Sequence, residues 1–123
     1  MKKVTQQVVP AVRVASYALS KPFYEKLGFR ELWTHQFEPG LPFFAAIARD
    51  DMQVFLTEHT GDCAFGALVH FYVDDVDAVH LEFLQQGLHV TEPPGNDLGP
   101  SVRNMLMVDL DGNRLNFVTV TEP

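Results

Sequence analysis

The chain has 123 residues, of which 46% are hydrophobic and 20% charged, so it can bury one domain-sized core and is not of the disordered class. Nine Lys and Arg residues stand against sixteen Asp and Glu residues. The resulting net charge of −7 argues against nucleic-acid binding, which needs a basic face. An acidic surface suits a cationic partner, or serves solubility alone.

Two further exclusions concern location. No apolar run approaches the ~18 residues needed to span a bilayer, and Met1-Lys2-Lys3 is not followed by the apolar core of a leader peptide. The single cysteine, Cys63, cannot form a disulfide within the chain. We therefore expect a cytoplasmic protein with no membrane partner and no nucleic-acid partner.

The first half of the chain predicts a strand, a helix and three further strands. Residues 8–14 form a short apolar run, in which Pro10 indicates an edge strand or a bend. Ser20 as N-cap and Gly28 as C-cap bracket a short helix, with Pro22 in its first turn. The remaining expected elements are an extended segment at 29–37 and strands at 42–48 and 52–57, joined by a tight turn at 49–51.

The second half repeats this order. A strand at 67–73 precedes Asp74 and Asp75, which can cap a following helix that ends at Gly87. The expected apolar stripe of that helix consists of Val76, Val79, Phe83 and Leu84. The last elements are a brief strand at 88–91, a loop at 92–100 and a hairpin of strands at 104–109 and 114–121 around a turn at 111–113.

The spacing of these elements indicates an internal repeat. Gly28 lies 14 residues after Val14, and Gly87 lies 14 residues after Val73, which gives an offset of 59 residues between the halves. We expect one domain, 1–123, made of two modules at 1–60 and 66–123. Two such modules side by side can bury a shared concave face.

Three segments carry a resemblance to a known family. Residues 23–29, FYEKLGF, are similar to the "FY…LGF" motif of the vicinal-oxygen-chelate superfamily, which includes glyoxalase I, extradiol dioxygenases, fosfomycin-resistance enzymes and bleomycin-resistance proteins. Residues 109–115, DLDGNRL, resemble its "D-P-D-G-N" hairpin, and residues 73–77 resemble the start of its second module. The resemblance covers nearly the whole chain. It implies an α+β fold in which two tandem βαβββ modules form a curled mixed sheet with a concave cleft.

In the enzymes of that superfamily the cleft holds a divalent metal, bound by His or Glu on four strands. The resemblance places those four positions at Val9, Phe55, Leu68 and Asn116. Three of them are hydrocarbon side chains, and one amide oxygen is a weak ligand. We therefore expect no metal, no cofactor and no catalytic residue. A chain of this superfamily without those metal ligands resembles the bleomycin-resistance type, which binds an antibiotic without chemistry.

Aromatic residues make up 11% of the chain, and aromatic walls with a few polar groups suit a flat heteroaromatic ligand. Strand alternation puts His70 and Tyr72 on the same face as Leu68. The alternative to ligand binding is that these side chains fill the core or a dimer interface. Asp50 and Asp51 are likewise expected for the turn that they form. The candidate ligand-binding residues are Trp33, His35, Phe37, Phe43, Phe44, Phe55, Leu68, His70, Tyr72 and Asn116, with Glu92 and Asp97 as candidates to hold a cationic group.

The sequence thus predicts a protein that binds and sequesters a bleomycin-family antibiotic, or a similar cationic and aromatic one. The resemblance also implies a homodimer in which the first strand, with Pro10 near its hinge, can be exchanged between partners. The loop at 99–103 lacks the tryptophan that such proteins often carry, so the identity of the ligand is not determined by the resemblance. Two alternatives remain: a diverged glyoxalase- or dioxygenase-like enzyme that uses His70, Tyr72 and Asn116, and a small-molecule binding protein with no resistance role.

Overall fold

A computed structural model describes residues 6–121 of the chain. The expectation of no leader peptide rests on Met1 to Lys3 and lies outside the described residues. The elements in chain order are β1 (Ala11–Arg13), α1 (Tyr17–Lys26), β2 (Arg30–His35), β3 (Phe44–Arg49), β4 (Met52–Thr57), β5 (Leu68–Tyr72), α2 (Val76–Gln85), β6 (Glu92–Gly95), β7 (Val102–Val108) and β8 (Arg114–Val120).

Each half of the chain folds into a four-stranded mixed sheet with one helix. The strand orders are β1-β4-β3-β2 and β5-β8-β7-β6. In each sheet the first strand runs parallel to the last, and the other neighbours are antiparallel. The predicted α+β fold of two tandem βαβββ modules is therefore confirmed. We call residues 11–57 module 1 and residues 68–120 module 2.

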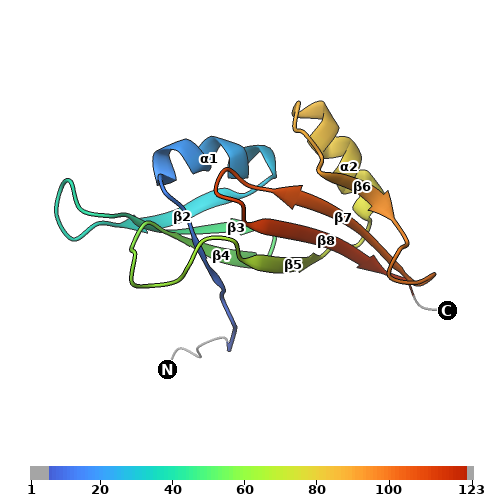
Figure 1. Cartoon of the computed structure of the whole chain (residues 1–123), viewed down its shortest axis with the longest axis horizontal. Coiled ribbons are helices and arrows are strands. Elements are labelled where there is room, and N and C mark those ends of the chain that lie inside the picture. Colours follow the sequence, from blue (N-terminus) through green and yellow to red (C-terminus); the bar gives the residue numbers. More distant parts are fainter. Residues whose placement is uncertain (1–5, 122–123) are drawn as a thin grey trace, which may run out of the picture.

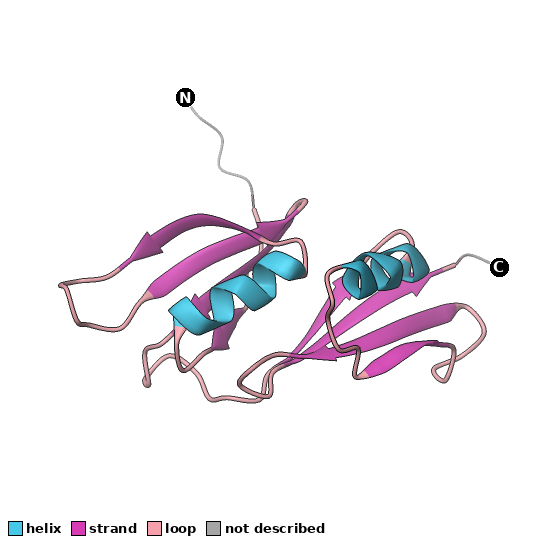
Figure 2. Ribbon diagram, turned by 90° about the horizontal axis from the view of Figure 1, so that it is seen from above, coloured by secondary structure: helices cyan, strands magenta, loops and turns pink. Residues whose placement is uncertain are grey.

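The two sheets lie side by side, and both helices cover the same side of them (Figure 1, Figure 2). We call the opposite, uncovered side of the sheets the open face. Alternation along β5 shows the division: Phe71 is buried on the helix side, whereas His70 and Tyr72 are exposed on the open face. The open face is therefore the surface that both sheets offer to a ligand or a partner.

The positions of the two helices agree with the predicted repeat. α1 and α2 begin and end at positions that differ by the expected offset. Gly28 and Gly87 follow them with φ of +91° and +74°, the left-handed region that glycine adopts without strain. Each glycine N–H bonds back to a carbonyl in the last turn of its helix, so both residues act as helix stops.

The predicted start of the first helix is wrong. α1 begins at Tyr17, and its N-cap is Ser16, whose hydroxyl accepts a hydrogen bond from the Leu19 N–H at 3.2 Å. Ser20 is buried inside the helix, and Pro22 lies beyond the first turn. Ser16 and Ser20 are both capping residue types, and Pro22 favoured the wrong one of the two. The predicted cap of the second helix is confirmed, because Asp75 accepts from two backbone N–H groups.

Two strand predictions are also corrected. The expected loop at 92–100 contains β6, and the expected strand at 88–91 does not form. β6 tolerates Pro93 and Pro94 because it is an edge strand that pairs only with β7. Of residues 8–14, only Ala11–Arg13 form a strand, although the Pro10 carbonyl still accepts from the Phe55 N–H.

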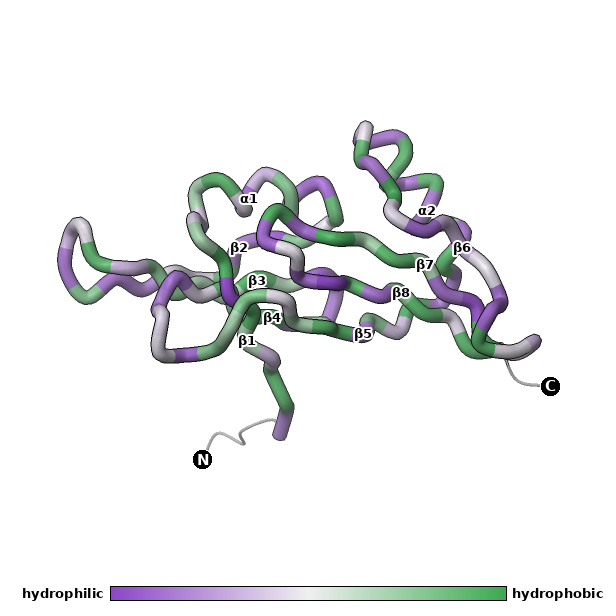
Figure 3. The backbone as a smooth tube through the Cα atoms, viewed as in Figure 1, coloured by the Kyte–Doolittle hydropathy of each residue, from purple (hydrophilic) through white to green (hydrophobic). Residues whose placement is uncertain are grey.

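One hydrophobic core runs between the helices and both sheets. Across the seam between the modules, the rings of Phe29 and Phe71 meet edge to face at 5.5 Å, and Phe71 stacks on Phe117 at 5.0 Å. Figure 3 shows a mostly hydrophobic β7 beside a β8 with hydrophilic stretches, while the tube alternates in hydropathy along both helices. Val76, Val79 and Phe83 of the predicted α2 stripe are buried, but Leu84 is half exposed.

Polar contacts fasten the same seam. The side chain of Asn113, which is fully buried, donates to the Arg13 carbonyl of module 1 at 2.8 Å. The side-chain oxygen of Asn113 accepts the N–H groups of Gly66 and Ala67 in the linker between the modules, at 3.0 and 2.9 Å. The DGN turn therefore holds both modules and the linker together.

Two further pairs cross the seam. Tyr24 of α1 donates to Asp109 at 2.6 Å in a buried hydrogen bond. Arg49 at the end of β3 donates to the Leu27 carbonyl and forms an ion pair with Glu82 of α2. Both modules are thus held in one fixed arrangement.

Candidate functional site

Three aromatic rings form a cluster on the open face of module 1. A bulge between Glu31 and Trp33 places Trp33 opposite Ala46 and turns it to the open face. Trp33 lies nearly parallel to Phe44, with centroids 6.0 Å apart and planes 16° apart. Phe55 contacts both rings at 5.8 and 5.0 Å. We call Trp33, Phe44 and Phe55 the aromatic cluster; Trp33 is 46% exposed, so a planar ligand could add to it.

The aromatic cluster continues into a cavity at the outer end of the sheet. The cavity measures about 280 Å³ and is lined by His35, Phe37, Phe44, His59 and Asp62. The Phe37 ring stands edge-on to His35 at 4.6 Å and to His59 at 6.3 Å. Asp62, which accepts from the Thr57 hydroxyl at 2.7 Å, contributes the carboxylate of this lining. The sequence analysis did not single out Asp62, because its connector carries no motif.

The open face of module 2 carries polar side chains in the corresponding place. Asn104 donates through its amide nitrogen to the amide oxygen of Asn116 at 2.9 Å. The Asn116 nitrogen lies 3.1 Å from Nδ1 of His70. We call Asn104, Asn116 and His70 the amide row. Sequence analysis placed His70 on this face but missed Asn104, which only the register of β7 against β8 brings into the row.

The remaining predicted site residues divide between the faces. Leu68 and Tyr72 are exposed on the open face beside His70. Phe43 lies on the helix side, where its ring is 6.3 Å from that of Tyr17, so the structure does not bring it to the aromatic cluster. Glu92 lies in the edge strand β6 and Asp97 in the turn after it, both exposed.

The four positions that the resemblance gives to a metal do not fit one. Val9, Phe55 and Leu68 have no donor atom, and the Asn116 amide is engaged with its neighbours in the amide row. Within residues 6–121, no group of three or more His, Cys, Asp or Glu side chains is placed to hold a metal ion. We therefore derive no metal-assisted step for this site.

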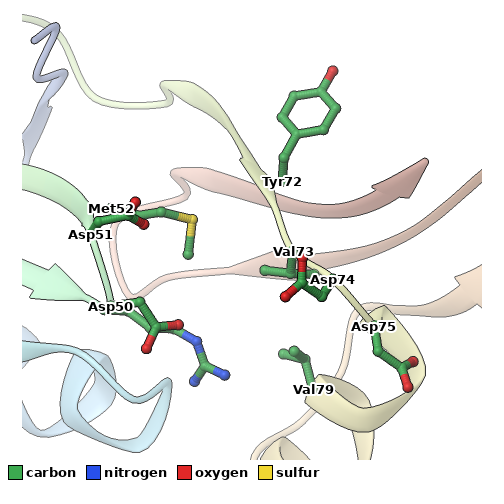
Figure 4. A pocket seen from close by; sticks show the side chains of 9 residues that line it. Asp50, Asp51, Met52, Tyr72, Val73, Asp74, Asp75 and Val79 are labelled. Atoms are coloured by element: carbon green, nitrogen blue, oxygen red, sulfur yellow. The ribbon is translucent and has the colours of Figure 1, made fainter. Parts of the chain in front are cut away.

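Another cavity lies at the seam between the modules, beside the β3–β4 turn. It measures about 580 Å³, and Figure 4 shows Asp50 and Asp51 on one side of it and Asp74 and Asp75 on the other. Asp50 and Asp51 form the hairpin turn, with Asp50 at φ +54°, and Asp75 is occupied as the helix cap. Asp50 and Asp51 therefore lie in the turn, as predicted, and the Asp75 carboxylate caps α2.

A smaller cavity of about 350 Å³ adjoins the amide row. It lies under the chain before β1, and its lining includes Gln7, Val8, Asp51, His70 and Tyr72. Val8 is almost fully exposed there. The chain leading into β1 therefore borders the open face of module 2.

Two tyrosines have strongly perturbed acidity, and both lie on the helix side. Burial, together with the Asp109 carboxylate, holds the pKa of Tyr24 far above its ordinary value. Burial and the Glu31 carboxylate raise the pKa of Tyr17 in the same direction. Because these hydroxyls face the core side, they stabilise the fold rather than serve the open face.

Comparison with known proteins agrees with this architecture. The family model described as glyoxalase superfamily protein matches residues 2–122. The chain belongs to the glyoxalase superfamily. No curated protein matches it.

Solved structures of the glyoxalase superfamily fold share its arrangement over almost the whole chain. The bleomycin resistance determinant encoded on transposon Tn5 has a TM-score of 0.77 at 20% identity, covering 96% of this chain and 100% of that one. TnmS3, an antibiotic-binding protein from Streptomyces sp. CB03234, has a TM-score of 0.77 at 22% identity, covering 98% and 100%. TioX from Micromonospora sp. ML1 has a TM-score of 0.77 at 20% identity, covering 95% and 100%. At these identities the similarity shows the fold alone.

Neither helix within the described part of this glyoxalase superfamily chain is long and apolar enough to cross a membrane.

Proposed function

We propose that the protein binds and sequesters a bleomycin-family antibiotic, or a similar cationic and aromatic one, in the cytoplasm and without chemistry. The aromatic cluster is the observation that carries this proposal. Stacked rings that stay half exposed lose contact with water when a flat ring covers them, which favours binding. Asp62, in the cavity beside the cluster, supplies a carboxylate for a cationic group.

The absence of a fitting metal set supports binding over catalysis. Three of the four metal positions are hydrocarbon, and Phe55 at one of them belongs to the aromatic cluster itself. Structural neighbours include a bleomycin resistance determinant and an antibiotic-binding protein, which agrees with the same proposal.

We further propose that the protein acts as a homodimer. The open face of module 2 leaves Leu68 and Tyr72 exposed, and Val8 before Pro10 is 95% exposed. Large apolar side chains gathered on one face mark an interaction surface. A second copy can cover them, and exchange of the chain around Pro10 would bring Val8 under cover. Light scattering at micromolar concentration should give twice the chain mass, and a monomer would contradict the dimer.

Calorimetric titration with metal-free and copper-loaded bleomycin tests the binding proposal. We expect one drug per chain at micromolar affinity or tighter. Trp33 is the sole tryptophan, so its fluorescence reports directly on the aromatic cluster. The expected result is heat of binding together with a fluorescence change. No heat and no fluorescence change would exclude bleomycin as the ligand.

Neighbouring phenylalanines provide a matched control. Phe44→Leu removes a ring from the open face, whereas Phe43→Leu removes one from the helix side. We expect Phe44→Leu to weaken drug binding by about tenfold to a hundredfold, the size of an aromatic hot spot. Phe43→Leu should leave affinity unchanged at a temperature where both variants are folded. Equal losses in the two variants would contradict binding at the cluster.

Analysis of the drug after incubation separates sequestration from turnover. Sequestration predicts that the drug is recovered unchanged and that protection rises with the molar ratio of protein to drug. Modified drug formed in excess over the protein would instead establish an enzyme.

A further inference from the structure

The amide row of module 2 has a defined hydrogen-bond direction. Asn104 Nδ2 donates to Asn116 Oδ1 at 2.9 Å, which leaves the Asn116 nitrogen to face His70 Nδ1 at 3.1 Å. An amide nitrogen only donates hydrogen bonds, so Nδ1 of His70 must accept. An accepting Nδ1 carries no proton, and the neutral ring then carries its hydrogen on Nε2.

The row is built rather than incidental. Asn116 is only 7% exposed, and a buried amide needs its partners because water cannot easily replace them. Both of its side-chain groups are used, one by Asn104 and one by His70. His70 itself is exposed and borders the cavity of about 350 Å³. Its second ring nitrogen is therefore the part of the row that can reach a ligand.

We propose that Asn104 and Asn116 fix His70 as the neutral Nε2–H tautomer, so that His70 is a hydrogen-bond donor to the ligand. The proposal rests on the binding function proposed above and specifies the ligand chemistry: an acceptor such as a carbonyl oxygen or an unprotonated ring nitrogen. His70 is the contacting group. Asn116 and Asn104 are positioning residues that act through it.

Protonation of His70 conflicts with this arrangement. A cationic ring donates from both nitrogens, and its Nδ1–H would point at the N–H of Asn116. Relief requires the Asn116 amide to rotate, after which its nitrogen would face the nitrogen of Asn104. Asp51 and Tyr72 also line the cavity beside His70.

Nitrogen NMR of the full-length, ¹⁵N-labelled protein tests the tautomer without any ligand. His70→Gln identifies the His70 signals by their loss. At neutral pH we expect the Nδ1 resonance of His70 in the range of an unprotonated ring nitrogen and Nε2 in the range of a protonated one. His35, whose ring contacts Phe37, serves as a reference in the same spectrum.

Two substitutions sharpen the test. Asn116→Asp presents an oxygen that only accepts, so we expect the proton to appear on Nδ1, which reverses the wild-type pattern. Asn116→Leu removes the partner, and the two nitrogen resonances should move toward averaged positions. If Asn116→Leu fails to fold, the wild type and Asn116→Asp decide the question. A protonated Nδ1 in the wild type, or averaged resonances that Asn116→Asp leaves unchanged, would overturn the proposal.

Drug binding tests the donor role separately. With metal-free bleomycin as the probe, His70→Phe keeps a flat ring but loses the donor, and we expect about a tenfold loss of affinity. Unchanged affinity would overturn the donor role. If the wild type shows the expected tautomer but binds no drug, the bleomycin proposal fails while the assigned tautomer stands.

Discussion

The two modules share one backbone plan but present different chemistry on the open face. The register of β1 on β4 pairs Ala11 with Phe55, and the register of β5 on β8 pairs His70 with Asn116. The next strand corresponds in the same way. Phe44 pairs with the residue that lies two positions after Phe55, and Asn104 pairs with the residue that lies two positions after Asn116. Where module 1 carries the aromatic cluster, module 2 carries the amide row.

This difference shows that the repeat determines positions and leaves their chemistry free. Stacked rings favour a flat apolar surface but orient it weakly, whereas a fixed hydrogen-bond donor selects one orientation. We expect a ligand in contact with both surfaces to be held by the first and oriented by the second. Variants at corresponding positions of the two modules test how far the equivalence goes.

The largest expected difference lies in the two hairpin turns. Asn113→Ala removes the hydrogen bonds from the β7–β8 turn to Arg13 and to the linker, leaving buried partners unsatisfied. We expect it to lower the free energy of unfolding by about 4 kcal/mol. Asp51→Ala in the exposed β3–β4 turn should change it by less than about 0.5 kcal/mol. Urea unfolding measures both, and equal effects would show that the DGN turn does not join the modules.

The helix-stop glycines give the next test. A Cβ on Gly28 would overlap Nη1 of Arg49, whereas a Cβ on Gly87 would meet nothing within 4 Å. Both positions have positive φ, so alanine costs about 1 kcal/mol at either. Gly28→Ala must also displace Arg49 from the Leu27 carbonyl and Glu82, and we expect a total near 3 kcal/mol. Thermal unfolding that ranks the two variants equally would contradict this contact.

Alkaline pH tests the buried pair between the modules. The pKa of Tyr24 is raised in the folded protein, so as pH rises above about 10 the unfolded chain loses this proton first. The stabilising contribution is therefore complete below that pH and is lost progressively above it. Tyr24→Phe should cost about 1 to 2 kcal/mol at neutral pH, because the buried hydrogen bond to Asp109 is gone. Its unfolding free energy should also fall less steeply above pH 10 than that of the wild type.

The sequence predicted the fold well because its motifs are structural. Gly28 ends a helix where Arg49 approaches the backbone, and the Asn113 side chain accepts hydrogen bonds from the linker. Both residues are therefore needed by the fold rather than by a ligand. The open face was harder to predict. Alternation placed His70 correctly, but Trp33 reaches the aromatic cluster through a bulge, which has no signal in the sequence.

Long-range register explains the other omissions. Asn104 and Asn116 meet because the DGN turn sets the register of β7 on β8, and that register could have been counted from the turn. Asp62 joins the aromatic cavity through an irregular connector, whose path depends on tertiary contacts such as the hydrogen bond from Thr57.

The smallest expected effect concerns the ion pairs that join each helix to its sheet at the surface. Module 2 has Asp77 with Arg103 at 2.8 Å, and module 1 has Lys21 with Glu31 at 3.7 Å. The hydrogen bond from Arg103 lowers the pKa of Asp77, so the pair stabilises the fold at neutral pH and is lost as pH falls through that lowered pKa.

Both pairs are exposed, and solvent and salt screen them. Arg103→Gln and Lys21→Gln should therefore shift the unfolding midpoint less than Tyr24→Phe, and the shifts should shrink further in high salt. A larger loss for Arg103→Gln that persists in high salt would show that module 2 depends on this pair in a way that module 1 does not.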